Sequence, residues 1–68
     1  MNRTSIRDSL KVRPFKPFIL RVTDGQQFHV LDPDDIAISP SQPIVIVFTT
    51  DHYYVLDAEK VSSIEVLP

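Results

Sequence analysis

His29 and His52 are the two side chains able to exchange protons near neutral pH, because an unperturbed imidazole titrates in that range. His29 stands in an extended apolar stretch, and His52 follows Asp51 in a predicted turn. No nucleophile-elbow pattern occurs, and the serines fall in other segments of the chain. We interpret both histidines as surface or edge residues and expect no enzyme activity. A hydrolase or metal site at either one is the least favoured alternative.

Three carboxylates in four positions, Asp32, Asp34 and Asp35, could attract a calcium ion. The segment has no Asp-x-Asp-x-Asp-Gly loop and no downstream glutamate to bind the ion with both oxygens. Pro33 and the acids instead indicate a turn in which the carboxylates cap nearby amides. The chain has no cysteine, no phosphate loop and no dinucleotide fingerprint. We predict no metal site and no cofactor.

Basic residues predominate in the first part of the chain and acidic residues in the rest. Up to Arg21 there are six bases and one acid, and after it one base and eight acids. A basic face of this kind contacts nucleic acid or an acidic partner, or else pairs with acidic loops within or between subunits. The formal net charge of −2 favours the second interpretation, since nucleic-acid binders are usually basic. The candidate contact residues are Arg3, Arg7, Lys11, Arg13, Lys16 and Arg21.

With 68 residues, the chain is expected to form a single domain over 1–68. A domain of this size buries only about 60% of the surface that its unfolded chain exposes, so small folds often need a disulfide, a metal or a partner subunit. Because the chain has no cysteine and we predict no metal site, oligomerisation is the remaining way to stabilise so small a fold. The N-terminus lacks the apolar core of a signal peptide, and the longest apolar run is far shorter than the ~20 residues of a membrane helix. We expect a soluble, cytoplasmic protein without membrane contact.

A short helix is predicted at about 4–12. Thr4 or Ser5 can cap it, and Ile6 and Leu10 lie four apart on one face. The residue before Pro14 is pushed out of the helical region, which ends the helix near position 12. Two apolar residues make a thin stripe, so this helix must dock on another element.

Asp24-Gly25 indicates a hairpin, and the facing residues decide its loop length. A two-residue turn would pair Leu20 with His29 and mix polar with apolar side chains on each face. A three-residue loop with Gly25 left-handed pairs Leu20 with Phe28, which keeps the apolar residues together. We predict the three-residue loop.

The continuous apolar run from Ile44 to Phe48 must form a central strand or one shared with a neighbouring subunit. The fold class is mainly β (α+β): an N-terminal helix followed by a small bent antiparallel five-stranded sheet or an SH3/Sm-like barrel. Extended segments are expected at about 17–23, 26–31, 36–39, 44–50, 53–57 and 61–67. Tyr53 and Tyr54 point to opposite faces of their strand, and an exposed tyrosine suits an interface. The candidate interface residues are Ile44, Ile46, Phe48, Tyr53 and Tyr54.

Two resemblances follow from these segments. The pattern Arg13-Pro14-Phe15-Lys16-Pro17-Phe18 with Thr23-Asp24-Gly25 resembles a group of short uncharacterised bacterial proteins. The element order is similar to the Sm-like fold, in which a bent antiparallel barrel carries an N-terminal helix and rings form through strand edges. Bacterial RNA chaperones of that fold carry a Tyr-Lys-His signature, whereas the corresponding segment 54–58 has neither the lysine nor the histidine.

The sequence therefore predicts a non-enzymatic homo-oligomeric or protein-interaction module. The alternative, which the Sm-like resemblance implies, is an RNA-binding protein that uses the basic N-terminal segment.

Overall fold

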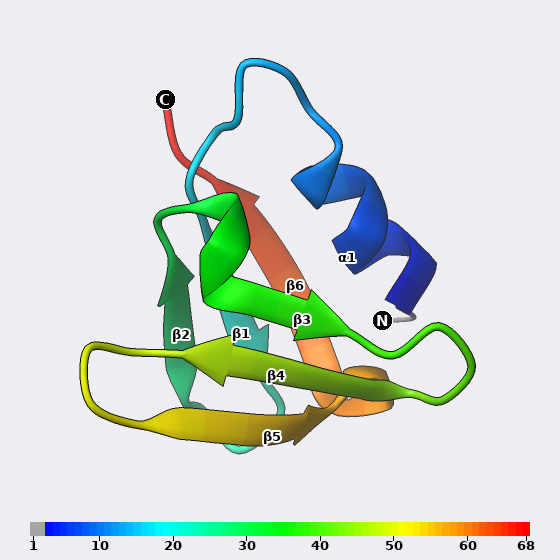
Figure 1. The fold of residues 1–68 in the computed structure, drawn as a ribbon. Helices are drawn as coiled ribbons and strands as arrows, with labels where there is room; N and C mark the ends of the chain where they lie inside the picture. The colour runs from blue at the N-terminus through cyan, green and yellow to red at the C-terminus, as the bar shows by residue number, and fades with distance from the viewer. Residues whose placement is uncertain (1–2) are drawn as a thin grey trace.

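The computed structural model describes residues 3–68, in which one α-helix precedes six strands (Figure 1). Short 3-10 turns precede the third and the last strand, and no helix in residues 3–68 is long and apolar enough to cross a membrane. The chain is mainly β with an N-terminal helix, as predicted. The elements are α1 (Arg3–Leu10), β1 (Phe18–Val22), β2 (Gln27–Val30), η1 (Pro33–Asp35), β3 (Ile36–Ile38), β4 (Ile44–Phe48), β5 (Tyr53–Asp57), η2 (Ala58–Lys60) and β6 (Val61–Val66).

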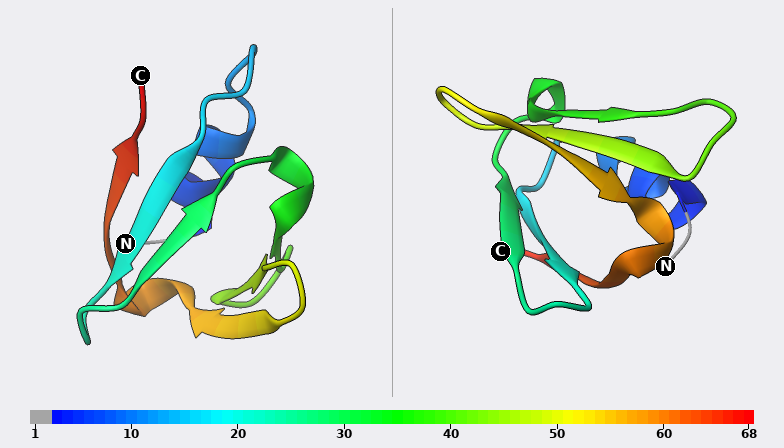
Figure 2. Two further views of the ribbon diagram at one scale, coloured as in Figure 1. Left: turned by 90° about the vertical axis from the view of Figure 1, so that its left-hand side faces the viewer. Right: turned by 90° about the horizontal axis from the view of Figure 1, so that it is seen from below.

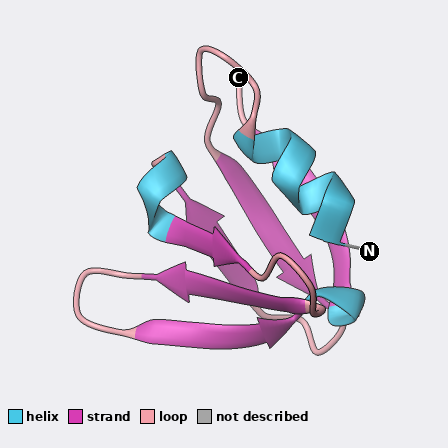
Figure 3. Ribbon diagram, turned by 45° about the vertical axis from the view of Figure 1, so that its right-hand side comes forward, coloured by secondary structure: helices cyan, strands magenta, loops and turns pink. Residues whose placement is uncertain are grey.

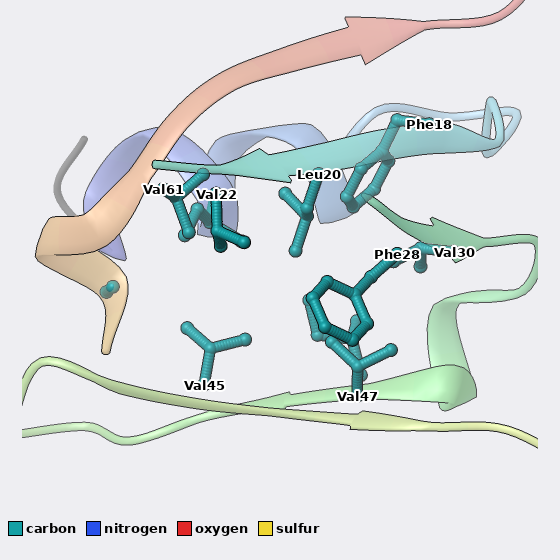
Figure 4. Close-up of a cluster of buried hydrophobic side chains, with 11 residues drawn as sticks. Phe18, Leu20, Val22, Phe28, Val30, Val45, Val47 and Val61 are labelled. Carbon is teal, nitrogen blue, oxygen red and sulfur yellow. The ribbon is translucent and has the colours of Figure 1, made fainter. Parts of the chain in front are cut away.

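The six strands form two antiparallel sheets of three strands, in the orders β2-β1-β6 and β3-β4-β5. The strands of one sheet run across those of the other, and the apolar core lies between them (Figures 1 and 4). The prediction of one five-stranded sheet or an SH3/Sm-like barrel is wrong, because the six strands form two separate sheets that do not close into a barrel.

The reason lies at the two corners where the chain passes from one sheet to the other (Figure 3). At the first corner, Asp32 accepts a hydrogen bond of 2.9 Å from the Asp34 amide, and Pro33 begins η1 without a donor of its own. At the second corner, Asp57 accepts one of 2.9 Å from the Glu59 amide and caps η2. These capped turns end the strand pairing at both corners.

The β1–β2 hairpin confirms the predicted register. Leu20 faces Phe28 and Phe18 faces Val30. The Val22 amide donates to the Gln26 carbonyl, and Gly25, at a φ of +94°, donates to the carbonyl of Val22. The loop therefore has three residues, with its one glycine in the left-handed region.

Helix α1 docks through the predicted face: Ile6 is fully buried in the core, and Leu10 packs against it. The helix begins at Arg3, so Thr4 and Ser5 lie in its first turn and not at its cap. It ends at Leu10, two residues before the expected end, and the Arg13 guanidinium donates to the carbonyl of Leu10 at 2.7 Å. This hydrogen bond satisfies one of the carbonyls that a helix end leaves unpaired.

Candidate interaction surface

The β4–β5 hairpin has one face in the core and one face open to solvent. Residues that face each other in an antiparallel ladder project on the same side of the sheet. Val45 and Val47 are 0% and 1% exposed and point toward the opposite sheet (Figure 4). Their neighbours in sequence therefore project outward. We call these outward side chains of β4 and β5 the hairpin face, formed by Ile44, Ile46, Phe48, Tyr53, Val55 and Asp57.

Apolar side chains dominate the hairpin face. Tyr53 is 67% exposed, Val55 61% and Phe48 42%, and all three count among the large exposed apolar residues of the described chain. Phe48 stands opposite Tyr53, and Val55 stands opposite the half-buried Ile46. Contiguous exposed apolar side chains of this kind mark interaction sites more often than isolated ones do.

The structure brings four of the five predicted interface residues together and separates the fifth. Tyr54 projects from the other side of β5, where its ring lies 5.1 Å from that of Phe28 on β2. The two rings meet at an interplanar angle of 59°, a tilted arrangement that aromatic pairs favour. Tyr54 thus contacts the other sheet, to which β5 is not joined by strand pairing.

The run from Ile44 to Phe48 confirms one of the two alternatives predicted for it. β4 is the central strand of its sheet, as one of the two alternatives required. Only one of its faces is covered within the chain, because Phe48 on the other face remains 42% exposed.

A groove of about 490 Å³ runs along the edge of β5. One wall is the β1–β2 loop with Asp24 and Gln26, and the other is the edge of β5 from Tyr54 to Asp57. Lys60 of η2 lies at the same groove, so it combines apolar surface with charges of both signs.

The six predicted basic contact residues do not gather on one surface. Arg21 lies on β1 and forms an ion pair with Glu65 of β6, while Arg7 donates to the Ser39 carbonyl. Lys11, Arg13 and Lys16 are exposed along the end of α1 and the connector to β1. The side chain of Arg3 lies outside the described part of the structure.

The histidines stand apart. His29 is exposed on β2, and the His52 Nδ1 lies 2.7 Å from a carboxylate oxygen of Asp51 at the exposed tip of the β4–β5 hairpin. Within residues 3–68, no group of three or more histidine, cysteine or acidic side chains could hold a metal ion.

Comparison of the chain with protein-family models, with curated proteins and with solved structures gives no match.

Proposed function

We propose that this chain is a non-enzymatic module that associates with a second copy of itself through the β4–β5 hairpin. The observation that carries the proposal is the hairpin face, where Phe48, Tyr53 and Val55 are exposed beside one another. Aromatic residues are enriched at the buried centre of protein interfaces, and charged residues are depleted there. Asp57 is the one charged residue of the hairpin face, and it stands at the end of β5.

The exposed area of the hairpin face supports self-association. An aromatic side chain buries on the order of 150–250 Å², so Tyr53 and Phe48 together still expose roughly 200 Å². That is about a quarter of the ~800 Å² that each partner contributes to a standard interface. Two side chains therefore offer about a quarter of the surface that each copy contributes to such an interface. The formal net charge of −2 opposes the approach of two copies only weakly.

Light scattering over a concentration series tests the proposal. The wild-type chain should show a mass above the 7.8 kDa of one chain, and the mass should rise with concentration. The double variant Tyr53→Ser, Val55→Ser should shift the mass to 7.8 kDa at concentrations where the wild type associates. Leu31→Ser is the matched control, because Leu31 is 62% exposed but lies off the hairpin. A wild-type mass of one chain at every concentration would contradict self-association.

A second candidate function rests on the exposed bases. In residues 4–68, Arg21 is the one member of the basic set whose side chain forms an ion pair with a carboxylate. Lys11 and Lys16 lie exposed near each other in sequence, at the end of α1 and in the connector. These exposed bases remain open to an external anionic partner such as RNA.

RNA retardation at low and high salt tests this second candidate. Electrostatic binding should weaken steeply with salt, and Lys11→Gln with Lys16→Gln should reduce both the affinity and the salt dependence. Lys60→Gln is the control, because Lys60 belongs to η2 and not to the basic segment. The absence of retardation at low salt would exclude RNA binding.

A further inference from the structure

Strand β5 has a hydrogen-bonded neighbour on one side only. In the order β3-β4-β5 it is an edge strand, paired with β4 from Tyr53 to Asp57. An edge strand presents a row of backbone donors and acceptors that another strand can pair with.

The hydrogen bonds at both ends of the hairpin show which backbone groups of β5 face outward. Thr49 donates to the His52 carbonyl, and Ala58 donates to the Pro43 carbonyl. Bonded and non-bonded pairs alternate along an antiparallel ladder, so Tyr54 and Leu56 exchange the hydrogen bonds with β4. The residues between them turn their backbone groups to the open edge. These residues are Tyr53, Val55 and Asp57.

This edge carries little of the protection that edge strands usually have. Its sequence is Tyr-Tyr-Val-Leu-Asp, with no proline or lysine and one acid at its end. Aromatic and β-branched residues favour pairing. The groove of about 490 Å³ between β5 and the β1–β2 loop leaves space along this edge.

We propose that β5 pairs antiparallel with β5 of a second copy, about a two-fold axis at Val55. The two sheets β3-β4-β5 then join into one sheet of six strands. This inference rests on the proposed function, since it specifies how the two copies meet. An interface on a two-fold axis must be self-complementary, and the sequence of β5 can be tested against that requirement.

The register about Val55 meets the requirement. Val55 faces its own copy, Tyr53 faces Asp57 of the second copy, and Tyr54 faces Leu56 of the second copy. No like charges stand opposite each other, and the Tyr53 hydroxyl is a donor opposite a carboxylate. Tyr53 and Val55, the most exposed apolar side chains of the hairpin, gain cross-strand neighbours. Both side chains lie on the outer face of this edge strand.

Cross-linking through a single cysteine tests this register, because the natural chain has none. In a bonded antiparallel pair the Cα atoms are about 5.5 Å apart, within the range that a disulfide spans. Val55→Cys should therefore form a covalent dimer under mild oxidation. Tyr53→Cys is the matched control: the two cysteines would lie four residues apart along the strands, about 13 Å, and should not cross-link. Equal cross-linking of both variants, or none with Val55→Cys, would overturn the register.

A backbone variant gives a second test. Val55→Pro removes an amide that faces the open edge and leaves the β4–β5 hydrogen bonds in place, so the fold should persist and the dimer should dissociate. His29→Pro is the matched control and should leave the dimer intact. The hydrogen bond from Val22 to Gln26 places the His29 amide on the open edge of β2, so this variant removes an equivalent amide from a different edge strand. Circular dichroism checks that both variants remain folded.

A charge variant probes the same register from the side chains. Tyr53→Asp places a carboxylate opposite Asp57 of the second copy, twice per dimer, and should weaken association by about tenfold. Tyr53→Lys places opposite charges there and should weaken association less than Tyr53→Asp does.

The outcomes separate this inference from the proposed function. A wild-type dimer that Val55→Pro does not dissociate and Val55→Cys does not cross-link would overturn the pairing while self-association stands. A wild-type chain that remains a monomer would overturn both the strand pairing and the proposed self-association. Binding of a foreign extended peptide in the groove would not restore either.

Discussion

Gly25 stands at the one position of the described chain where the backbone requires a positive φ. A Cβ at this position would meet no heavy atom within 4 Å, so a substitution here tests backbone conformation alone. Gly25→Ala should lower the free energy of unfolding by about 1–2 kcal/mol, because L-residues are strained in the left-handed region. Gly25→Asn should cost less, since asparagine visits that region more readily. Urea denaturation measures both, and an equal loss in the two variants would contradict the backbone explanation.

Tyr53, Tyr54 and Val55 show what a sequence can and cannot reveal about a candidate site. Three apolar residues in succession do not alternate with polar ones, so the pattern does not show which face of the strand is buried. The predicted interface did not include Val55, an apolar side chain of a type that is most often found in a core. Only the pairing of Val55 with Ile46 in β4 places it on the outer side.

Helix α1 is attached to the sheets by few side chains, of which Ile6 is the most deeply buried. Ile6→Ala should lower the free energy of unfolding by about 2–5 kcal/mol, because it removes a buried side chain and leaves a cavity. Leu10→Ala should cost less, since Leu10 is half-buried. A chemical denaturation curve measures both losses. If Ile6→Ala were as stable as the wild type, the helix would not contribute to the core.

The elements differ in how far the sequence could predict them. The β1–β2 register followed from one glycine and from alternating side chains, both local signals. Barrel closure was not predictable in this way. It depends on the corners at Asp32 and Asp57, where side-chain caps end the strands, and on how two sheets meet in space. The ring contact between Phe28 and Tyr54, which links the sheets, joins residues 26 positions apart and has no local signal.

The exposed bases that follow α1 and the exposed apolar side chains of β5 lie on different elements. Lys11, Arg13 and Lys16 follow α1, whereas Tyr53 and Val55 lie on β5. Figure 2 shows the segment after α1 in blue and β5 in yellow to orange. Self-association through β5 therefore leaves the basic segment outside the paired strands. The two candidate functions are compatible in one assembly, and variants of either surface should leave the other activity unchanged.

Hydrogen exchange at the Val55 amide reports directly on whether β5 is paired with a second copy. In a single chain this amide faces the open edge of β5 and should exchange rapidly, while Tyr54 and Leu56, bonded to β4, remain protected. Pairing with a second copy gives the Val55 amide an acceptor, so its exchange should slow as the concentration of the chain rises. If Val55 exchanged rapidly under conditions where the measured mass exceeds that of one chain, association through the edge of β5 would be contradicted.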